Sequence, residues 1–252
     1  GQELVQPLYD DQDVEATLKL VRAVDYHTPF QILPNVRATF HDAGHIMGSS
    51  FLELAITEHG ITRTLIGGGD LGRSHQAIIG DPEVGDRADM VMIESTYGNR
   101  RHKNEEDTNA ELIAVLKEVV ETRGTLLIPA FAVGRTQEML YRLFELSQSN
   151  SIPAMPVFVD SPMAREVTRI YELHKDLYDE KTLEYVRLGK NPLRTPDLHF
   201  TESVEDSMSL NNVPGPKIIL SASGMCDAGR IVHHLKHNIW QKNCHILFVG
   251  YQ

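Results

Sequence analysis

The side chains best suited to chemistry lie in two short turns of this chain. His45 ends the run His41-Asp-Ala-Gly-His45, and Asp70 lies 25 residues later in Gly69-Asp-Leu-Gly-Arg73. Each turn contains glycine and follows an apolar stretch that is typical of a β-strand. A histidine and an aspartate in loops at strand ends are common ligands of hydrolytic zinc sites, and glycine lets the backbone approach a metal closely. The two turns therefore predict a metal site.

Several further runs, in the same order along the chain, give this pattern its specificity. Glu94-Ser-Thr-Tyr-Gly98 follows another apolar stretch, and the three runs together resemble the metallo-β-lactamase fold and, within it, the β-CASP family of nucleic-acid-processing hydrolases. The resemblance continues through Ile128-Pro-Ala-Phe-Ala-Val-Gly-Arg-Thr-Gln-Glu138, Val159-Asp-Ser-Pro-Met-Ala164 and Ser221-Ala-Ser-Gly-Met225. It covers essentially the whole chain.

The resemblance implies zinc-dependent hydrolysis of RNA phosphodiester bonds, in RNA processing or decay. His45 would bind one of two zinc ions, and Asp70 would bridge both, since a carboxylate has two oxygens. Glu94 would be the second catalytic residue and would tune the proton donor for the leaving oxygen. The predicted substrate-binding residues are Ser95, Thr96, Arg135, Ser221, Ser223, Gly224, Met225 and His233.

Two of the substrate-binding predictions rest on helix starts. Arg135 opens a helix directly after a strand, and free amides at a helix N-terminus suit phosphate. The run Ser221–Met225 joins another strand to a glycine-containing turn. Because carboxyl ends of parallel strands share one edge, we expect both features on the same side of the sheet, facing the metal site.

Each of these residues also has a plainer interpretation. His45 could be a structural hydrogen bonder, Asp70 a turn former and Glu94 a cap for its own turn. Arg135 could simply be a solvent-exposed residue at the start of a helix. His41 either orients its turn through a hydrogen bond or is merely packed.

The remaining histidines are expected to be surface residues. His233 and His237 are spaced for one helix face, but no third ligand accompanies them, so they predict a helix surface, with phosphate contact by His233 as the alternative. His27 and the other scattered histidines are expected to face solvent.

The absence of expected family motifs leads to a second hypothesis. The family's main metal motif, His-x-His-x-Asp-His, does not occur in the chain, nor do its late motifs. We therefore expect the central portion of a larger protein, and expect this chain alone to be inactive and to bind zinc poorly. The alternative is a non-catalytic β-CASP paralogue that acts as a scaffold in an RNA-processing complex. A small-molecule hydrolase of the same fold is disfavoured, because it is not expected to carry the insertion that residues 98–252 resemble.

Composition narrows the class of protein. The chain has 252 residues, a net charge of −11 and two cysteines, Cys226 and Cys244. An acidic chain is a poor general nucleic-acid binder, so local basic groups and two zinc ions would have to attract phosphate. No apolar run approaches the roughly 20 residues that span a bilayer, which predicts no membrane association. The cysteines are expected to be reduced, in a cytoplasmic protein that works with RNA, as a possible homodimer or in a complex.

The elements that must position these residues indicate an α/β fold. Residues 1–97 would form part of a metallo-β-lactamase αββα sandwich, and residues 98–252 most of a parallel-sheet β-CASP domain. Expected helices include one near Asp11–Val24, one from Asp107 with Thr108 as its N-cap, and one over Asp176–Gly189.

Overall fold

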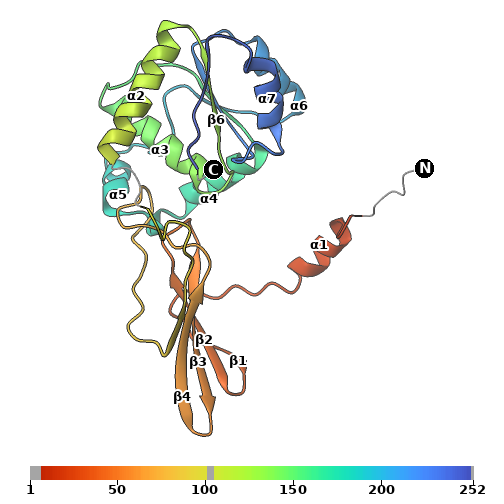
Figure 1. Cartoon of the computed structure of the whole chain (residues 1–252), viewed down its shortest axis with the longest axis vertical. Coiled ribbons are helices and arrows are strands. Elements are labelled where there is room, and N and C mark those ends of the chain that lie inside the picture. Colours follow the sequence, from red (N-terminus) through yellow and green to blue (C-terminus); the bar gives the residue numbers. More distant parts are fainter. Residues whose placement is uncertain (1–6, 101–104, 251–252) are drawn as a thin grey trace, which may run out of the picture.

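The chain folds around two five-stranded sheets, which lie in residues 30–92 and 125–246. The computed structural model describes residues 7–100 and 105–250. Figure 1 shows the first sheet as a ladder of hairpins that projects from a rounded, helix-covered unit built on the second sheet. The α/β fold class is confirmed: the first sheet is mainly antiparallel and the second is parallel. We propose residue 98 as the boundary between the two regions.

The first sheet has the order β1-β2-β3-β4-β5. Its strands are β1 (Phe30–Leu33), β2 (Val36–Asp42), β3 (Ser50–Glu58), β4 (Ile61–Gly68) and β5 (Met90–Met92). Strands β1 to β4 pair antiparallel, and β5 pairs parallel to β4. The two long strands β3 and β4 are joined at His59 and Gly60, which both have positive φ, as a tight hairpin turn requires.

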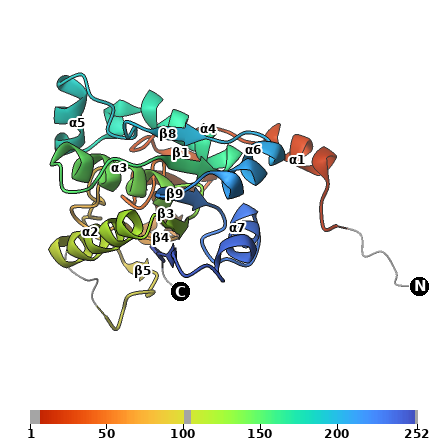
Figure 2. The ribbon, with the colours of Figure 1, turned by 90° about the horizontal axis from the view of Figure 1, so that it is seen from above.

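The second sheet has the order β10-β6-β9-β7-β8, and every neighbouring pair is parallel. Its strands are β6 (Thr125–Pro129), β7 (Val157–Asp160), β8 (Leu198–Phe200), β9 (Lys217–Ser221) and β10 (Cys244–Ile246). The helices around it are α2 (Glu105–Glu121), α3 (Arg135–Gln148), α4 (Pro162–Leu173), α5 (Glu180–Arg187), α6 (Val204–Ser209) and α7 (Arg230–Asn238), with short 3₁₀ turns η1 (Lys175–Leu177) and η2 (Leu210–Asn212). Helices lie on both sides of this sheet when it is seen from above (Figure 2).

Both faces of the second sheet are apolar and covered. Residues at alternate positions point to opposite faces, so Leu126 and Ile128 pack with α2 and α3, whereas Leu127 packs with Ile231 of α7. Every residue of β6 and β9 is buried. Strands buried on both faces read as continuous apolar runs, which is why these two strands were predictable from sequence.

An apolar cluster joins the two regions. Ile78 and Ile79, in the long loop between β4 and β5, are buried against Tyr141, Tyr171 and Tyr178 of the second region. Ile79 also forms an isolated antiparallel bridge with Tyr178. This loop therefore contains the side chains that hold the first sheet to the second.

Three helices differ from the prediction. The first, α1 (Asp11–Leu18), is shorter than expected and buries none of its residues. Helix α2 begins at Glu105, so the prediction of Thr108 as its N-cap was wrong; Glu106 and Asp107 extend it, because acidic residues are favourable in a first turn. The helix expected over residues 176–189 is split, since Tyr178 is extended to pair with Ile79 and α5 starts afresh with Asp179 as N-cap.

Strands β1 and β8 and helix α6 were not predicted. Both cysteines are free, as expected. In the described part of the chain, no helix combines the length and the apolar character that crossing a bilayer demands.

Candidate functional site

The turn after β2 presents His45 at the end of the first sheet. Asp42 accepts a hydrogen bond from the Gly44 amide at 2.8 Å, and the Ser49 hydroxyl oxygen accepts from the amides of His45 and Ile46 at 3.1 and 3.2 Å. Hydrogen bonds to the side chains of Asp42 and Ser49 thus fix the backbone of the turn on both sides of His45. The His45 imidazole remains 38% exposed, which leaves it available to a ligand.

The loop after β4 docks against this turn and brings Asp70 to it. The Gly72 amide donates to the Ala43 carbonyl at 2.8 Å, and a Cβ on Gly72 would lie 1.7 Å from the Gly44 carbonyl oxygen. Only glycine allows this approach. As a result, the Asp70 carboxylate lies 3.6 Å from Nε2 of His45, with its side chain 70% exposed.

Glu94 follows β5 at the same end of the sheet. Its carboxylate accepts from the Thr96 amide at 2.7 Å. Hydrogen bonds from Thr96 lower the pKa of Glu94, and the Leu71 amide and the charge of His45 lower it further. Glu94 is therefore ionised at neutral pH and acts as an acceptor, while Ser95 and Thr96 lie exposed beside it. We call His45, Asp70 and Glu94 the rim site.

The rim site offers part of a metal-binding set. One imidazole nitrogen and one carboxylate face each other across 3.6 Å, both accessible, and these are donor types that zinc accepts. The two residues fit one shared cation as partial ligands. A closed coordination shell needs further donors, which the described residues do not place at the rim site, because the one group of three candidate ligands among them lies elsewhere.

Arg135 is connected to the rim site through Glu138. The buried Glu138 carboxylate pairs with Arg135, with Arg142 at 3.1 Å and with Arg73 at 4.0 Å. Arg73 lies three residues after Asp70 in the docking loop. The three guanidinium groups against one carboxylate make this junction locally basic in an acidic chain.

The turn Ser221–Met225 lies at the same sheet edge as the start of α3. Pro129 and Ser221 are register partners, and the Ala130 amide donates to the Ser221 carbonyl at 3.1 Å. Within the turn, Ser221 is buried and its hydroxyl donates to the Asp160 carbonyl. Gly224 is buried against Phe131, and Met225 is 45% exposed.

Ser223 has a partner within this turn, because its hydroxyl donates to Asp227 at 2.6 Å. The contacts of Ser221 and Ser223 give both side chains a structural role in shaping the turn.

A buried polar cluster under this turn was missed by the sequence analysis. Asp160, with no exposed surface, accepts from Nε2 of His234 at 2.6 Å and from Arg230 at 2.7 Å, and also from the Ser207 and Thr201 hydroxyls. Burial alone would raise the pKa of Asp160, but these hydrogen bonds hold it far below its ordinary value.

The position of His234 explains why its neighbour is free to face solvent. His234 is the inward-facing member of the His233-His234 pair, and His233 is exposed on α7. The structure does not bring His233 into contact with the rim site. The sequence contains one sign of the buried cluster, because Asp160 stands at the end of the apolar strand β7.

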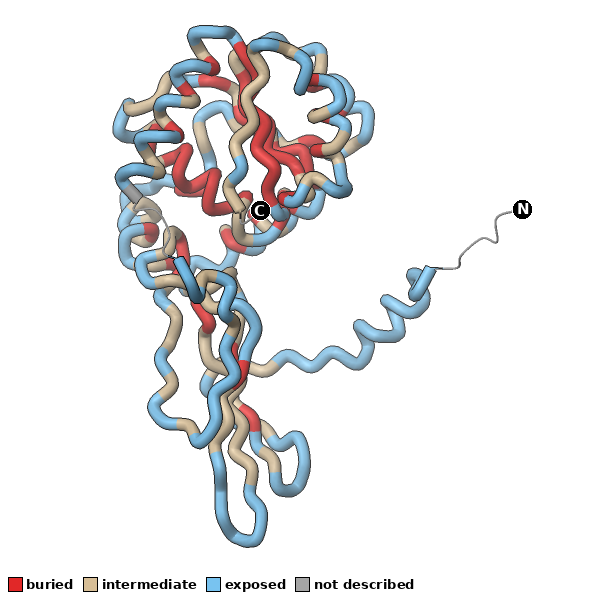
Figure 3. Tube along the Cα trace, in the orientation of Figure 1, coloured by how far each residue is buried: buried red, intermediate tan, exposed pale blue. Residues whose placement is uncertain are grey.

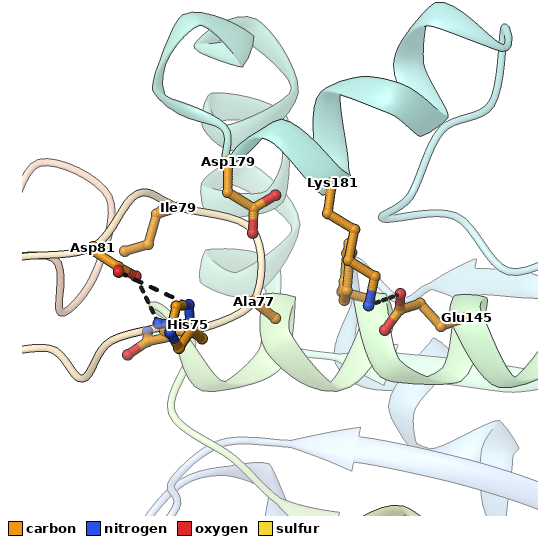
Figure 4. A pocket seen from close by; sticks show the side chains of 9 residues that line it. His75, Ala77, Ile79, Asp81, Glu145, Asp179 and Lys181 are labelled. Atoms are coloured by element: carbon orange, nitrogen blue, oxygen red, sulfur yellow. Dashed lines mark hydrogen bonds and ion pairs between the residues drawn. The ribbon is translucent and has the colours of Figure 1, made fainter.

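A cavity at the junction lies apart from these residues. It has a volume of about 270 Å³ and is lined by His75, Asp81 and Asp179 and by the Lys181–Glu145 ion pair, whose N···O distance is 2.6 Å (Figure 4). It contains none of the residues that the sequence predicts for chemistry. The rim site is open to solvent, since the side chains of His45 and Asp70 are 38% and 70% exposed.

Comparisons with known proteins bear on this geometry. A Beta-Casp domain matches residues 136–252. Ribonuclease TTHA0252 of Thermus thermophilus is 37% identical over 247 residues, covering 98% of this chain and 56% of that protein. Transcription termination factor FttA is 32% identical in Methanosarcina mazei and 31% in Thermococcus kodakarensis, covering 97% and 98% of this chain and 38% of each relative. The chain thus spans about half the length of the first relative and less of the others.

Proposed function

The chain belongs to the β-CASP family, and we propose that the protein is a zinc-dependent hydrolase that cleaves RNA phosphodiester bonds. The observation that carries the proposal is the convergence of His45, Asp70 and Glu94 at one open rim. A relative named a ribonuclease, 37% identical over nearly the whole chain, supports RNA as the substrate class.

The residues of the rim site would have different roles in the reaction. His45 and Asp70 would hold zinc, with further ligands from outside the described residues. Zinc, when bound, supplies positive charge that stabilises the phosphoryl oxygens during hydrolysis. Glu94, kept ionised by the Thr96 hydrogen bonds, would accept a hydrogen bond from the proton donor of the leaving group and hold it in place.

The second region would hold the RNA strand. Arg73 and Arg135 keep 40% and 37% of their side chains exposed while anchored on Glu138, so each can also face a phosphate. The start of α3 and the Ser221–Met225 turn lie at one sheet edge. The amides of Arg135, Thr136 and Ser223 already donate to backbone carbonyls, so the guanidinium groups would be the main phosphate contacts. Positive charge concentrated here would offset the net charge of −11.

Substitution of Asp70 tests the proposal. In the intact protein, Asp70→Ala should lower RNA cleavage by at least about 100-fold, beyond the 10- to 100-fold typical of residues that only support a ligand, and should release zinc. The control is Asp86→Ala, since Asp86 is exposed elsewhere in the same loop region. Cleavage near the wild-type rate in Asp70→Ala would refute the assignment. A wild-type protein that binds RNA without cleaving it would instead favour the scaffold hypothesis.

A further inference from the structure

A second cluster of metal-ligating side chains lies away from the rim site. His27, His41 and Glu83 each offer one ligand atom, and these atoms all lie within 4.8 Å of one another. Nε2 of His27 is 2.7 Å from one oxygen of Glu83, and Nδ1 of His41 is 3.2 Å from the other. Ligand atoms bound to one zinc ion at about 2.0–2.2 Å would be separated by about 3.4 Å in tetrahedral geometry, so only a small adjustment is needed.

The backbone holds these three residues together independently of their side chains. The His27 amide donates to the Phe40 carbonyl at 2.9 Å, and the Glu83 amide donates to the Asp42 carbonyl at 3.0 Å. Phe40 and Asp42 flank His41 in β2. Three separate segments are therefore fixed in register around one histidine, and chance contact between mobile surface side chains would show no such anchoring.

The surroundings of His41 favour a cation over a simple ion pair. Its ring stacks on Phe51 at 5.0 Å, which fixes the ring plane, and its buried Nε2 makes no hydrogen bond but faces the Glu53 carboxylate at 3.5 Å. A proton on Nε2 would point at Glu53 and leave the lone pair of Nδ1 facing Glu83. Metal-binding histidines are commonly oriented in this way by a carboxylate behind the ring.

We propose that His27, His41 and Glu83 bind one divalent cation of the zinc class, at a site separate from His45 and Asp70. Two imidazole nitrogens and one carboxylate suit zinc and neighbouring transition metals better than magnesium or calcium, which prefer all-oxygen shells. The His27 side chain is 60% exposed, so water can complete the coordination. The proposal does not depend on the function proposed above.

Such a cation would brace the turn that carries His45. Glu83 follows Pro82, and a Cβ on Gly44 would lie 2.4 Å from the Pro82 nitrogen, so the two segments are in close contact. Tying Glu83 to His41 would hold Pro82 against Gly44, next to His45. The site would thus be structural, and its loss should loosen the turn without removing a rim ligand.

The test is zinc stoichiometry and thermal stabilisation of the purified protein, stripped with chelator and titrated with zinc chloride. His27 has φ of 59°, so the variant is His27→Asn, because asparagine tolerates left-handed backbone. The matched control is His59→Asn, at an exposed turn position with φ of 50°. Glu83→Gln provides a second variant that preserves side-chain size.

We expect His27→Asn and Glu83→Gln each to remove one zinc equivalent, or weaken it at least tenfold, and to reduce the zinc-dependent rise in Tm. His59→Asn should change neither quantity. Asp70→Ala should leave the His27-dependent equivalent in place. If His27→Asn and Glu83→Gln bind the same number of zinc ions as wild type with equal affinity, or if Asp70→Ala removes the equivalent, the site does not exist as proposed.

Discussion

The two sheets of this protein differ in how far their strands are buried. In the second sheet, every residue of β6 and β9 is buried, whereas in the first sheet every residue of β5 is exposed and few side chains are buried at all. Figure 3 shows the contrast directly, with buried residues concentrated in the helix-covered region. The rim site nevertheless belongs to the first sheet. Its geometry therefore depends on loop-to-loop contacts and on the junction cluster more than on a core of its own.

The contrast in burial predicts the largest difference between the regions. Leu220→Ala, at a side chain with no exposed surface, should lower the free energy of unfolding by about 2–5 kcal/mol. Leu33→Ala, at a side chain 56% exposed in β1, should lower it by at most about 0.5 kcal/mol. Urea unfolding measures both. Equal losses would show that the first sheet has a core that its exposure does not reveal.

The buried Asp160 cluster predicts a pH-dependent loss in the second region. Asp160→Asn removes the charge that His234 and Arg230 face, and should cost about 1.5–3 kcal/mol near neutral pH. Because the folded-state pKa of Asp160 is lowered, its stabilisation is complete above the unfolded pKa near 3.9 and is lost as pH falls through the folded value.

The difference between wild type and Asp160→Asn in urea unfolding should therefore hold from pH 7 to about pH 4.5 and shrink in stronger acid. Asp197→Asn is the control, since its contact with His199 is exposed and contributes little. A difference that stays constant down to pH 2 would show that the charge of Asp160 is not the stabilising feature.

Within the first region, the docking of the two loops predicts a smaller effect. Gly72→Ala should cost about 1–3 kcal/mol, because its Cβ would overlap the Gly44 carbonyl and push the Asp70 loop away from His45. Gly69→Ala in the same loop meets open space and should be nearly neutral. Amide chemical shifts of residues 43–49 report the displacement. Unchanged shifts in Gly72→Ala would mean that the loops do not depend on this contact.

The contrast between the regions also explains which elements the sequence could predict. Strands β6 and β9 were predictable because strands buried on both faces read as continuous apolar runs with turn residues after them. Strands β1 and β8 were missed because they are short and half-exposed edge strands, whose pairing is decided by tertiary contacts. The split before α5 depended on Tyr178 pairing with a loop roughly 100 residues away, which local pattern cannot show.

Candidate site residues divide in the same way. His45, Asp70 and Glu94 lie in glycine-rich or polar turns after apolar strands, and that local signal predicted each of them at a strand end. The pairing of the strands brings these ends together. Glu138, which joins Arg73 to Arg135, lies in a helix and gives no local sign of pairing across the two regions. His27 was predicted to face solvent, and its side chain is 60% exposed. The sequence did not reveal that its ring also meets Glu83, because both segments bond to β2.

We propose that the first region supplies the chemistry and that the second region binds the same RNA. The most direct measurement is the salt dependence of RNA binding by the intact protein for Arg135→Ala, with Arg169→Ala, at an exposed position on α4, as control. One lost phosphate contact should lower the slope of log K against log salt by about 0.7–0.9, with zinc content unchanged and the control slope equal to wild type. An unchanged slope in Arg135→Ala would contradict the account and leave Arg135 with only its structural contact to Glu138.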